Sequence, residues 1–182
     1  MSHNYYIIKV VQALLRSENH IRSLAKELGT NQTTIARKVQ ELHVDNVVDF
    51  KQEGKNKVVF LKRTLEARQY AYLVEAHKLL ELLKKYPQLR RIIELIKKNE
   101  KVLLAILFGS YAKGIAKRES DIDIYLATNE RKLKEDIEAI DSKIHVKTGA
   151  YDKTSLLIQE IEKNHVIVKG IEAYYEKNQF FS

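Results

Sequence analysis

The sequence reads Ala105-Ile-Leu-Phe-Gly-Ser-Tyr-Ala-Lys-Gly-Ile-Ala-Lys-Arg-Glu-Ser-Asp-Ile-Asp-Ile-Tyr-Leu126 in the segment that decides the fold of its C-terminal part. An apolar run over residues 102–108 is long enough for one strand and too short for a helix, and it stops at Gly109-Ser110. Glycine lets a backbone approach a ligand closely, and a helical turn after it would direct free N–H groups and the Ser110 hydroxyl at an anion. The first half of the segment therefore predicts a strand followed by a phosphate-binding bend.

The second half of the segment carries two acidic residues in an alternating pattern. Asp121 and Asp123 are two positions apart in Ser-Asp-Ile-Asp-Ile-Tyr-Leu, a pattern typical of a strand, so both carboxylates are expected on one face. Mg²⁺ takes oxygen ligands and is commonly held by one or two carboxylates together with substrate phosphates. The alternative is a simple hairpin turn followed by the solvated face of an edge strand.

Together these residues form the pattern Gly-Ser-x-x-x-Gly-x(5)-Ser-Asp-x-Asp, which resembles the minimal nucleotidyltransferase family of the DNA polymerase β superfamily. The resemblance covers roughly residues 101–175. It implies a small mixed sheet, a bend that binds a nucleoside triphosphate, and two Mg²⁺ ions, if the protein is active, on Asp121 and Asp123. It also implies transfer of a nucleoside monophosphate to an acceptor, with pyrophosphate leaving. The nucleotide-binding residues predicted in this way are Gly109, Ser110, Lys113, Gly114 and Ser120.

One feature of the family pattern is missing. Members that catalyse transfer generally carry a third carboxylate on the following strand, but the next strand-like run here is Lys143-Ile-His-Val-Lys-Thr148. His145 occupies the aligned position and is predicted as a catalytic base, because the unperturbed pKa of histidine is about 6.5; the alternative is an ordinary half-buried side chain. Asp141 and Glu138 are further candidates. Two functions follow: an active Mg²⁺-dependent nucleotidyltransferase, or a catalytically inactive regulator that senses a nucleotide.

The N-terminal third predicts three helices and a β-hairpin. Apolar residues recur at helical spacing over residues 4–16 and 20–28, and a third helix is expected after its N-cap Asn31. Two β-rich runs, 46–51 and 57–62, predict the hairpin. Residues 23–42 resemble the helix-turn-helix of winged-helix transcription regulators, whose third helix enters the major groove of DNA. The predicted DNA-contacting residues are Gln32, Thr33, Thr34, Arg37 and Lys38 on the outer face of that helix and Lys55 and Lys57 on the hairpin.

The charge distribution agrees with a DNA partner. The chain carries a formal net charge of +8, and residues 1–63 hold eleven lysines or arginines against six aspartates or glutamates. Basic side chains contribute most of the affinity of proteins for nucleic-acid phosphates. The alternative is that this domain binds another protein.

These observations predict an α+β protein with a winged helix-turn-helix over residues 1–63, a helical connector over 64–98 and a nucleotidyltransferase-like domain over 99–182. In the connector, Leu65, Tyr72, Leu79 and Tyr86 recur at seven-residue intervals. This stripe either pairs two subunits into a homodimer or packs against the transferase domain.

The composition sets further limits. The chain has no cysteine, which excludes disulfides and thiolate metal sites. No apolar run reaches about 18 residues and the N-terminus lacks a secretory pattern, so we expect a cytoplasmic protein without a membrane partner. Some minimal nucleotidyltransferases act with a separately encoded helical protein, and the resemblance implies such a partner as a further possibility.

Overall fold

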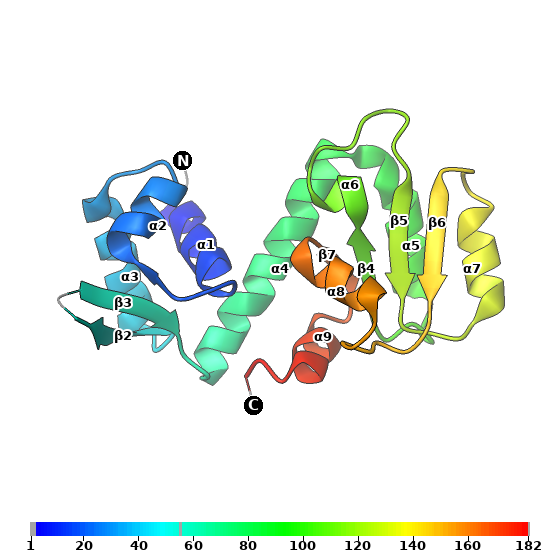
Figure 1. Cartoon of the computed structure of the whole chain (residues 1–182). Helices are drawn as coiled ribbons and strands as arrows, with labels where there is room; N and C mark the ends of the chain where they lie inside the picture. Colours follow the sequence, from blue (N-terminus) through cyan, green and yellow to red (C-terminus); the bar gives the residue numbers. More distant parts are fainter. Residues whose placement is uncertain (1–2, 55, 182) are drawn as a thin grey trace. The chain divides into compact units, whose positions relative to one another are not determined.

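The computed structural model describes residues 3–54 and 56–181. The chain divides into two compact units (Figure 1). One holds the residues up to His77 together with Phe180 and Phe181, and the other comprises Lys78–Gln179. The division falls inside one long helix, α4 (Leu65–Lys85).

The first unit contains the predicted helices and hairpin. Its elements before α4 are α1 (His3–Leu14), β1 (Asn19–His20), α2 (Ile21–Glu27), α3 (Gln32–Val44), β2 (Val48–Glu53) and β3 (Asn56–Leu61). The strands form an antiparallel sheet in the order β1-β3-β2. The two-residue strand β1 was not predicted, because Asn19 and His20 carry no apolar alternation and become a strand only by pairing with Val59 and Val58.

The third helix begins as its sequence predicts. The side chain of Asn31 accepts a hydrogen bond from the backbone N–H of Thr34 at 2.8 Å, which satisfies one of the unpaired donors of the first turn. Ile35, Val39 and Leu42 form the buried stripe of α3, each with no exposed surface.

Burial changes along the predicted seven-residue stripe, which runs along α4 to Tyr86. Leu79 and Tyr86 are buried in the core of the second unit, whereas the side chain of Leu65 is 66% exposed. A helix of 3.6 residues per turn drifts only about 20° per heptad, so the four positions stay on one broad side of the helix and differ in what covers them.

The second unit contains a four-stranded mixed sheet. Its elements after α4 are η1 (Pro87–Leu89), α5 (Arg90–Lys98), β4 (Ala105–Phe108), α6 (Gly109–Ala112), β5 (Ile122–Leu126), α7 (Arg131–Glu138), β6 (Ile144–Thr148), α8 (Leu156–Lys163), β7 (Val166–Lys169) and α9 (Ile171–Asn178). The strand order is β6-β5-β4-β7, with β5 parallel to β6 and the other pairs antiparallel. The prediction of a small mixed sheet is confirmed.

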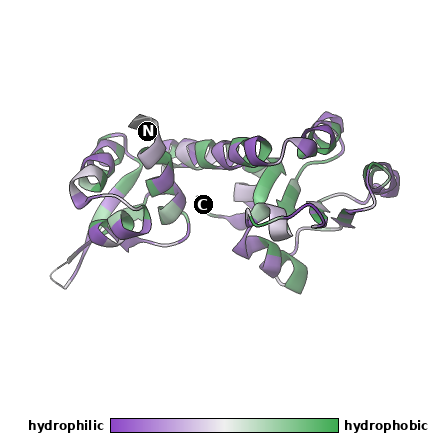
Figure 2. Cartoon of the chain, turned by 90° about the horizontal axis from the view of Figure 1, so that it is seen from above, coloured by the Kyte–Doolittle hydropathy of each residue, from purple (hydrophilic) through white to green (hydrophobic). Residues whose placement is uncertain are grey.

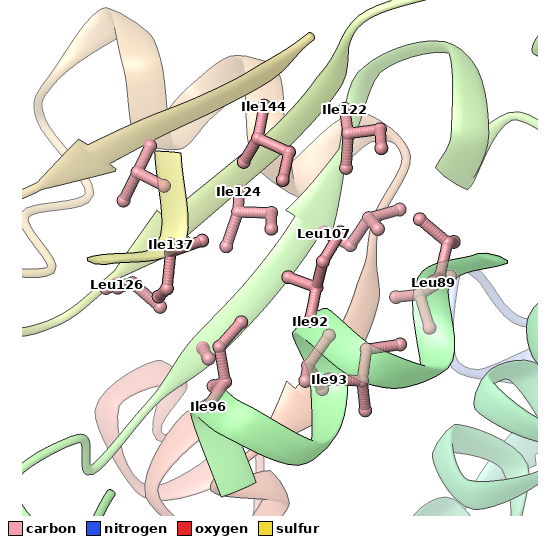
Figure 3. Packing of buried hydrophobic residues seen from close by; sticks show 14 of the residues in the cluster. Leu89, Ile92, Ile93, Ile96, Leu107, Ile122, Ile124, Leu126, Ile137 and Ile144 are labelled. Atoms are coloured by element: carbon pink, nitrogen blue, oxygen red, sulfur yellow. The ribbon is translucent and has the colours of Figure 1, made fainter. Parts of the chain in front are cut away.

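One face of this sheet is packed by α5 and α7. Figure 3 shows Ile92, Ile93 and Ile96 of α5 lying against Leu107 and Ile124 of the strands. In Figure 2 the helices carry both hydrophilic and hydrophobic residues. Because successive strand residues face opposite sides, burial of Ile122 and Ile124 on this face directs Asp121 and Asp123 to the other.

The opposite face is partly covered by aromatic residues. The ring of Tyr125 on β5 lies 6.1 Å from that of Tyr151, and Tyr151 lies 6.2 Å from Tyr174 of α9. Glu162 accepts hydrogen bonds from the hydroxyls of both Tyr151 and Tyr174.

Among the helices of the described residues, none is both long enough and apolar enough to span a membrane.

Candidate functional site

The bend after β4 is held against the carboxylate of Asp123. Gly109 has a φ of +70°, a conformation that glycine adopts without strain. A Cβ atom at this position would lie 2.2 Å from Oδ2 of Asp123, closer than any real contact. Phe108 and Asp123 are paired across β4 and β5, which explains why the bend and the acid meet.

The bend is short and well anchored. The α6 helix has only four residues, and the backbone N–H groups of Lys113 and Ile115 donate to the carbonyls of Gly109 and Ser110, each at 3.1 Å. Nζ of Lys85 donates to the carbonyl oxygen of Gly114 at 2.6 Å. These bonds fix the segment that the sequence predicted to bind phosphates.

Tyr111, in the middle of α6, supports the bend from within the second unit. Its buried ring lies 4.8 Å from the ring of Tyr86, in an edge-to-face arrangement. Edge-to-face aromatic pairs contribute roughly 0.5–1.5 kcal/mol beyond their buried area. Tyr86, which directly follows α4, therefore helps to hold the bend in place through Tyr111.

The two aspartates lie on one face of β5, as predicted. Burial raises the pKa of Asp123, and the negative charge of Asp121 raises it further, while His145 and Lys147 act in the opposite direction. The two carboxylates therefore repel each other, and the repulsion is stronger because Asp123 is partly shielded from water. A bound cation relieves such repulsion, so this pair has the electrostatics of a cation site.

His145 lies beside both acids. It is opposite Asp123 in the register of β5 and β6, and its Nε2 atom is 3.6 Å from Oδ1 of Asp121. Its side chain is 51% exposed, so the ring is accessible from solvent.

The other acidic candidates are engaged elsewhere. Oε1 of Glu138 accepts the backbone N–H of Val146 at 2.9 Å, and Oδ1 of Asp141 accepts that of Lys143 at the same distance. Because β6 is the edge strand, Glu138 covers its free side, away from β5. In this structure each of these two carboxylates accepts a backbone N–H, and that either of them reaches a metal beside Asp121 stays a prediction.

The remaining predicted nucleotide-binding residues have different environments. Oγ of Ser120 accepts the backbone N–H of Lys117 at 2.9 Å, closing the turn that leads into Asp121. Lys113 is exposed; the pKa of Glu160 on α8 is lowered chiefly by the hydrogen bond and charge of Lys163, and the charge of Lys113 adds to this. Ser120 therefore shapes the turn, whereas Lys113 is free to meet an anion.

The donor set fits a divalent cation only in part. Within residues 3–54 and 56–181, no group of three His, Cys, Asp or Glu side chains is arranged to hold a metal. Two carboxylates are sufficient for Mg²⁺ when phosphates and water complete its shell. Asp121 and Asp123 can therefore hold Mg²⁺ together with a bound triphosphate.

The predicted DNA-contacting face of α3 is partly corrected. Gln32, Thr33 and Arg37 are exposed and Thr34 is half-buried, but Lys38 is only 2% exposed. Nζ of Lys38 donates to both carboxylate oxygens of Glu41, at 3.0 and 2.8 Å. Lys38 shares the buried side of the helix with Val39, because a long side chain can be buried when its charge is paired.

Of the two predicted hairpin lysines, the structure describes Lys57. Lys57 is exposed, and its Nζ lies 5.7 Å from the centre of the Phe50 ring. Lys55 falls outside the residues that the structure describes.

Two groups were missed by the sequence analysis. Lys147 lies on the same face of β6 as His145, a position that the strand alternation of residues 143–148 could have revealed. Ala36 and Gln40 are also exposed on α3. Each lies three residues after a predicted DNA contact, Thr33 or Arg37, so helical spacing places it on the same face.

The comparison with protein families agrees with the C-terminal site. Residues 90–176 match the model of a family described as "Polymerase beta, Nucleotidyltransferase". This match covers a little under half of the chain and includes the bend, both aspartates and His145. The second unit therefore contains a nucleotidyltransferase-like domain.

The other comparisons add little. No curated protein matches the chain. A solved structure described as "Crystal structure of the toxin-antitoxin with AMP-PNP" is 21% identical, covering 58% of this chain and 78% of that chain, with a TM-score of 0.34. A similarity of this size carries no argument about function.

Proposed function

We propose that the second unit binds a nucleoside triphosphate with Mg²⁺ and transfers its nucleoside monophosphate to a protein or nucleic-acid acceptor. The observation that carries this proposal is the contact between the Gly109 bend and the carboxylate of Asp123, which brings a phosphate-sized loop and a cation site together. The match of residues 90–176 to a nucleotidyltransferase family supports it.

In this proposal the side chains have separate roles. Asp121 and Asp123 hold Mg²⁺, which when bound neutralises the charge of the phosphates. The Gly109-Ser110 bend and Lys113 bind the triphosphate, and Gly114 and Ser120 keep the surrounding turns in place.

His145 is the proposed base. The acceptor oxygen attacks the α-phosphorus, forming an O–P bond, while the bond from that phosphorus to the β-phosphate oxygen breaks and pyrophosphate leaves. The proton of the acceptor hydroxyl passes to Nε2 of a neutral His145. The 51% exposure of this ring supports the role, because the acceptor must reach it.

A second function is favoured by one specific observation. The described residues of β6, Ile-His-Val-Lys-Thr, include no carboxylate, so the third acid of active family members has no counterpart there. In this alternative the domain binds a nucleotide as a signal, transfers nothing, and regulates DNA binding by the first unit.

For the first unit, we propose a winged helix-turn-helix that binds DNA. Three helices followed by a hairpin, the exposed residues Gln32, Thr33 and Arg37 on α3, and Lys57 on the hairpin support this proposal. We include Thr34, which is half-buried, among the proposed DNA contacts, and we exclude Lys38, which is buried. A cytoplasmic location, a homodimer and a separately encoded helical protein partner remain proposals that accompany it.

Transfer from each α-labelled nucleoside triphosphate in the presence of Mg²⁺ tests the two functions. We expect label on an added protein or nucleic acid, and we expect no label with Asp121→Asn or Asp123→Asn. Saturable nucleotide binding without transfer, combined with a change in DNA affinity, would support the sensing alternative. Transfer that persists in both variants would contradict the assigned site.

A further inference from the structure

The edge strand β6 presents two basic side chains beside the acidic pair. In the register of β5 and β6, His145 is opposite Asp123 and Lys147 is opposite Tyr125. His145 and Lys147 are exposed, whereas Ile144 and Val146, which alternate with them along the strand, are buried in the core. The two basic residues therefore share the face of the sheet that carries Asp121 and Asp123.

Lys147 lies close to the candidate site and is available to a ligand. Burial raises the pKa of Asp123, and the positive charge of Lys147 opposes this rise. Within the part of the chain that the structure describes, no carboxylate forms an ion pair with Lys147. The ammonium group of Lys147 can therefore bind an external anion.

Lys143, at the start of the same row, has a different role. Its Nζ donates to the carbonyl oxygen of Arg118 at 2.8 Å and lies 3.9 Å from a carboxylate oxygen of Glu119. Lys143 thus holds the turn that precedes Asp121, and Lys147 is the exposed lysine of the row that is left for binding.

The strand order separates two sides of the site. β4 and its Gly109 bend lie on one side of β5, and β6 lies on the other. If the bend binds the triphosphate, as the proposed function has it, the β6 side is left for the acceptor. On that side His145 comes first along the strand and Lys147 follows about 6.6 Å further on, since a strand rises about 3.3 Å per residue.

We propose that Lys147 binds a phosphate group of the acceptor, whose attacking hydroxyl lies next to His145. This inference rests on the proposed function, because it takes the β4 side as the place of the triphosphate. A lysine ammonium offers a compact charge and three donors, which suit a phosphate. Because the backbones of His145 and Lys147 are only about 6.6 Å apart on one face, their side chains can contact the hydroxyl and a phosphate of one terminal nucleotide, either free or at the end of a nucleic-acid strand.

The test is a titration of the full-length, ¹⁵N-labelled protein with the dinucleotide pApA, followed through the backbone amides of residues 144–148. A dinucleotide is too short to occupy a duplex-binding surface on the first unit. We expect saturable shifts in these amides. Binding should weaken roughly tenfold in Lys147→Ala, because a charge-assisted hydrogen bond is lost. Lys147→Arg should stay close to wild type, as should Lys132→Ala, which removes an exposed lysine from α7.

Titrations with two further ligands, AMP and inorganic phosphate, identify the source of the phosphate. Shifts with AMP or inorganic phosphate equal to those with pApA would assign a free phosphorylated acceptor, and a clear preference for pApA would assign a nucleic-acid end; both support a phosphate-binding Lys147. Wild-type affinity in Lys147→Ala would overturn the proposal. So would shifts in residues 144–148 caused by a hydroxyl-bearing peptide and not by pApA.

The outcome can be separated from that of the proposed function. The pApA titration is run without any nucleoside triphosphate. It is repeated on the double variant Asp121→Asn/Asp123→Asn, in which the loss of two negative charges should strengthen phosphate binding to Lys147. If the wild-type protein binds no Mg²⁺-nucleotide, the proposed function fails, while the effect of Lys147→Ala on pApA still decides the phosphate site.

Discussion

Gly109 lies so close to Asp123 that a Cβ atom on this glycine would be 2.2 Å from the carboxylate oxygen Oδ2. The contact joins the end of β4 to the start of β5, where Asp123 is half-buried. A terminal carboxylate can rotate away from an added methyl group, so a substitution here changes the site before it breaks the fold.

Gly109→Ala should therefore fold but lose Mg²⁺-dependent nucleotide binding. The positive φ of +70° costs an alanine about 1–2 kcal/mol of stability, and the methyl group displaces the Asp123 carboxylate. Gly29→Ala is the matched control, because Gly29 has a φ of +61° but no atom within 4 Å of the added Cβ. Equal nucleotide affinity in the two variants, measured by calorimetry, would show that the contact has no role in the site.

Arg37→Ala should weaken DNA binding and flatten its dependence on salt. Each lost phosphate contact lowers the slope of log K against log salt by about 0.9. Arg37 is changed alone, because the neighbouring Lys38 is buried with Glu41 and its loss would alter the stability of the helix. Arg16→Ala, an exposed arginine at the end of α1, is the control. A slope as steep as that of the wild type would remove α3 from the proposed interface.

Asp123→Asn should stabilise the metal-free protein at neutral pH. The pKa of Asp123 is raised in the folded state by burial and by Asp121. Its favourable contribution is thus complete below the unfolded pKa and is lost as the pH rises through the folded pKa. The gain in the variant should shrink toward acidic pH.

The measurement is thermal unfolding in EDTA at several pH values. Asp152→Asn is the control of opposite sign, because hydrogen bonds from Thr154 lower the pKa of Asp152 and stabilise its charged form at neutral pH. A loss of stability at neutral pH in both variants would refute the assigned electrostatics of Asp123.

His165 should make the second unit sensitive to acid. Burial lowers the pKa of His165 to about 4, and the charge of Lys78 acts in the same direction. The unfolded state binds a proton near pH 6.5, so the stability contributed by the neutral ring is complete above that pH and is lost between 6.5 and about 4. The loss is on the order of 3 kcal/mol. Urea unfolding from pH 7 to pH 4 should show a shallower decline in His165→Gln; an unchanged decline would contradict this origin.

Much of the fold was predictable because its signals are local. Asn31 caps α3, Pro87 begins the turn before α5, and the alternation around Asp121 and Asp123 marks β5. β7 was missed, because Val166–Lys169 is a four-residue apolar run between two helices and its pairing with β4 is a long-range feature.

The site was predictable in its residue types and less so in its surroundings. The spacing of Gly109, Ser110 and the two aspartates identified the residues, but their contact depends on the pairing of β4 with β5. Lys38 was wrongly placed on the exposed face of α3, because a sequence does not show which charged side chains find partners inside the fold.

The most direct test of the account is calorimetric binding of nonhydrolysable nucleoside triphosphate analogues, with and without Mg²⁺, to the wild-type protein and to Asp121→Asn/Asp123→Asn. We predict that the wild type binds at least one analogue only when Mg²⁺ is present, and that the double variant, although folded, does not. Mg²⁺-dependent binding of equal strength in the double variant, or no binding to the wild type, would contradict the claim that the bend and the two acids form the nucleotide site.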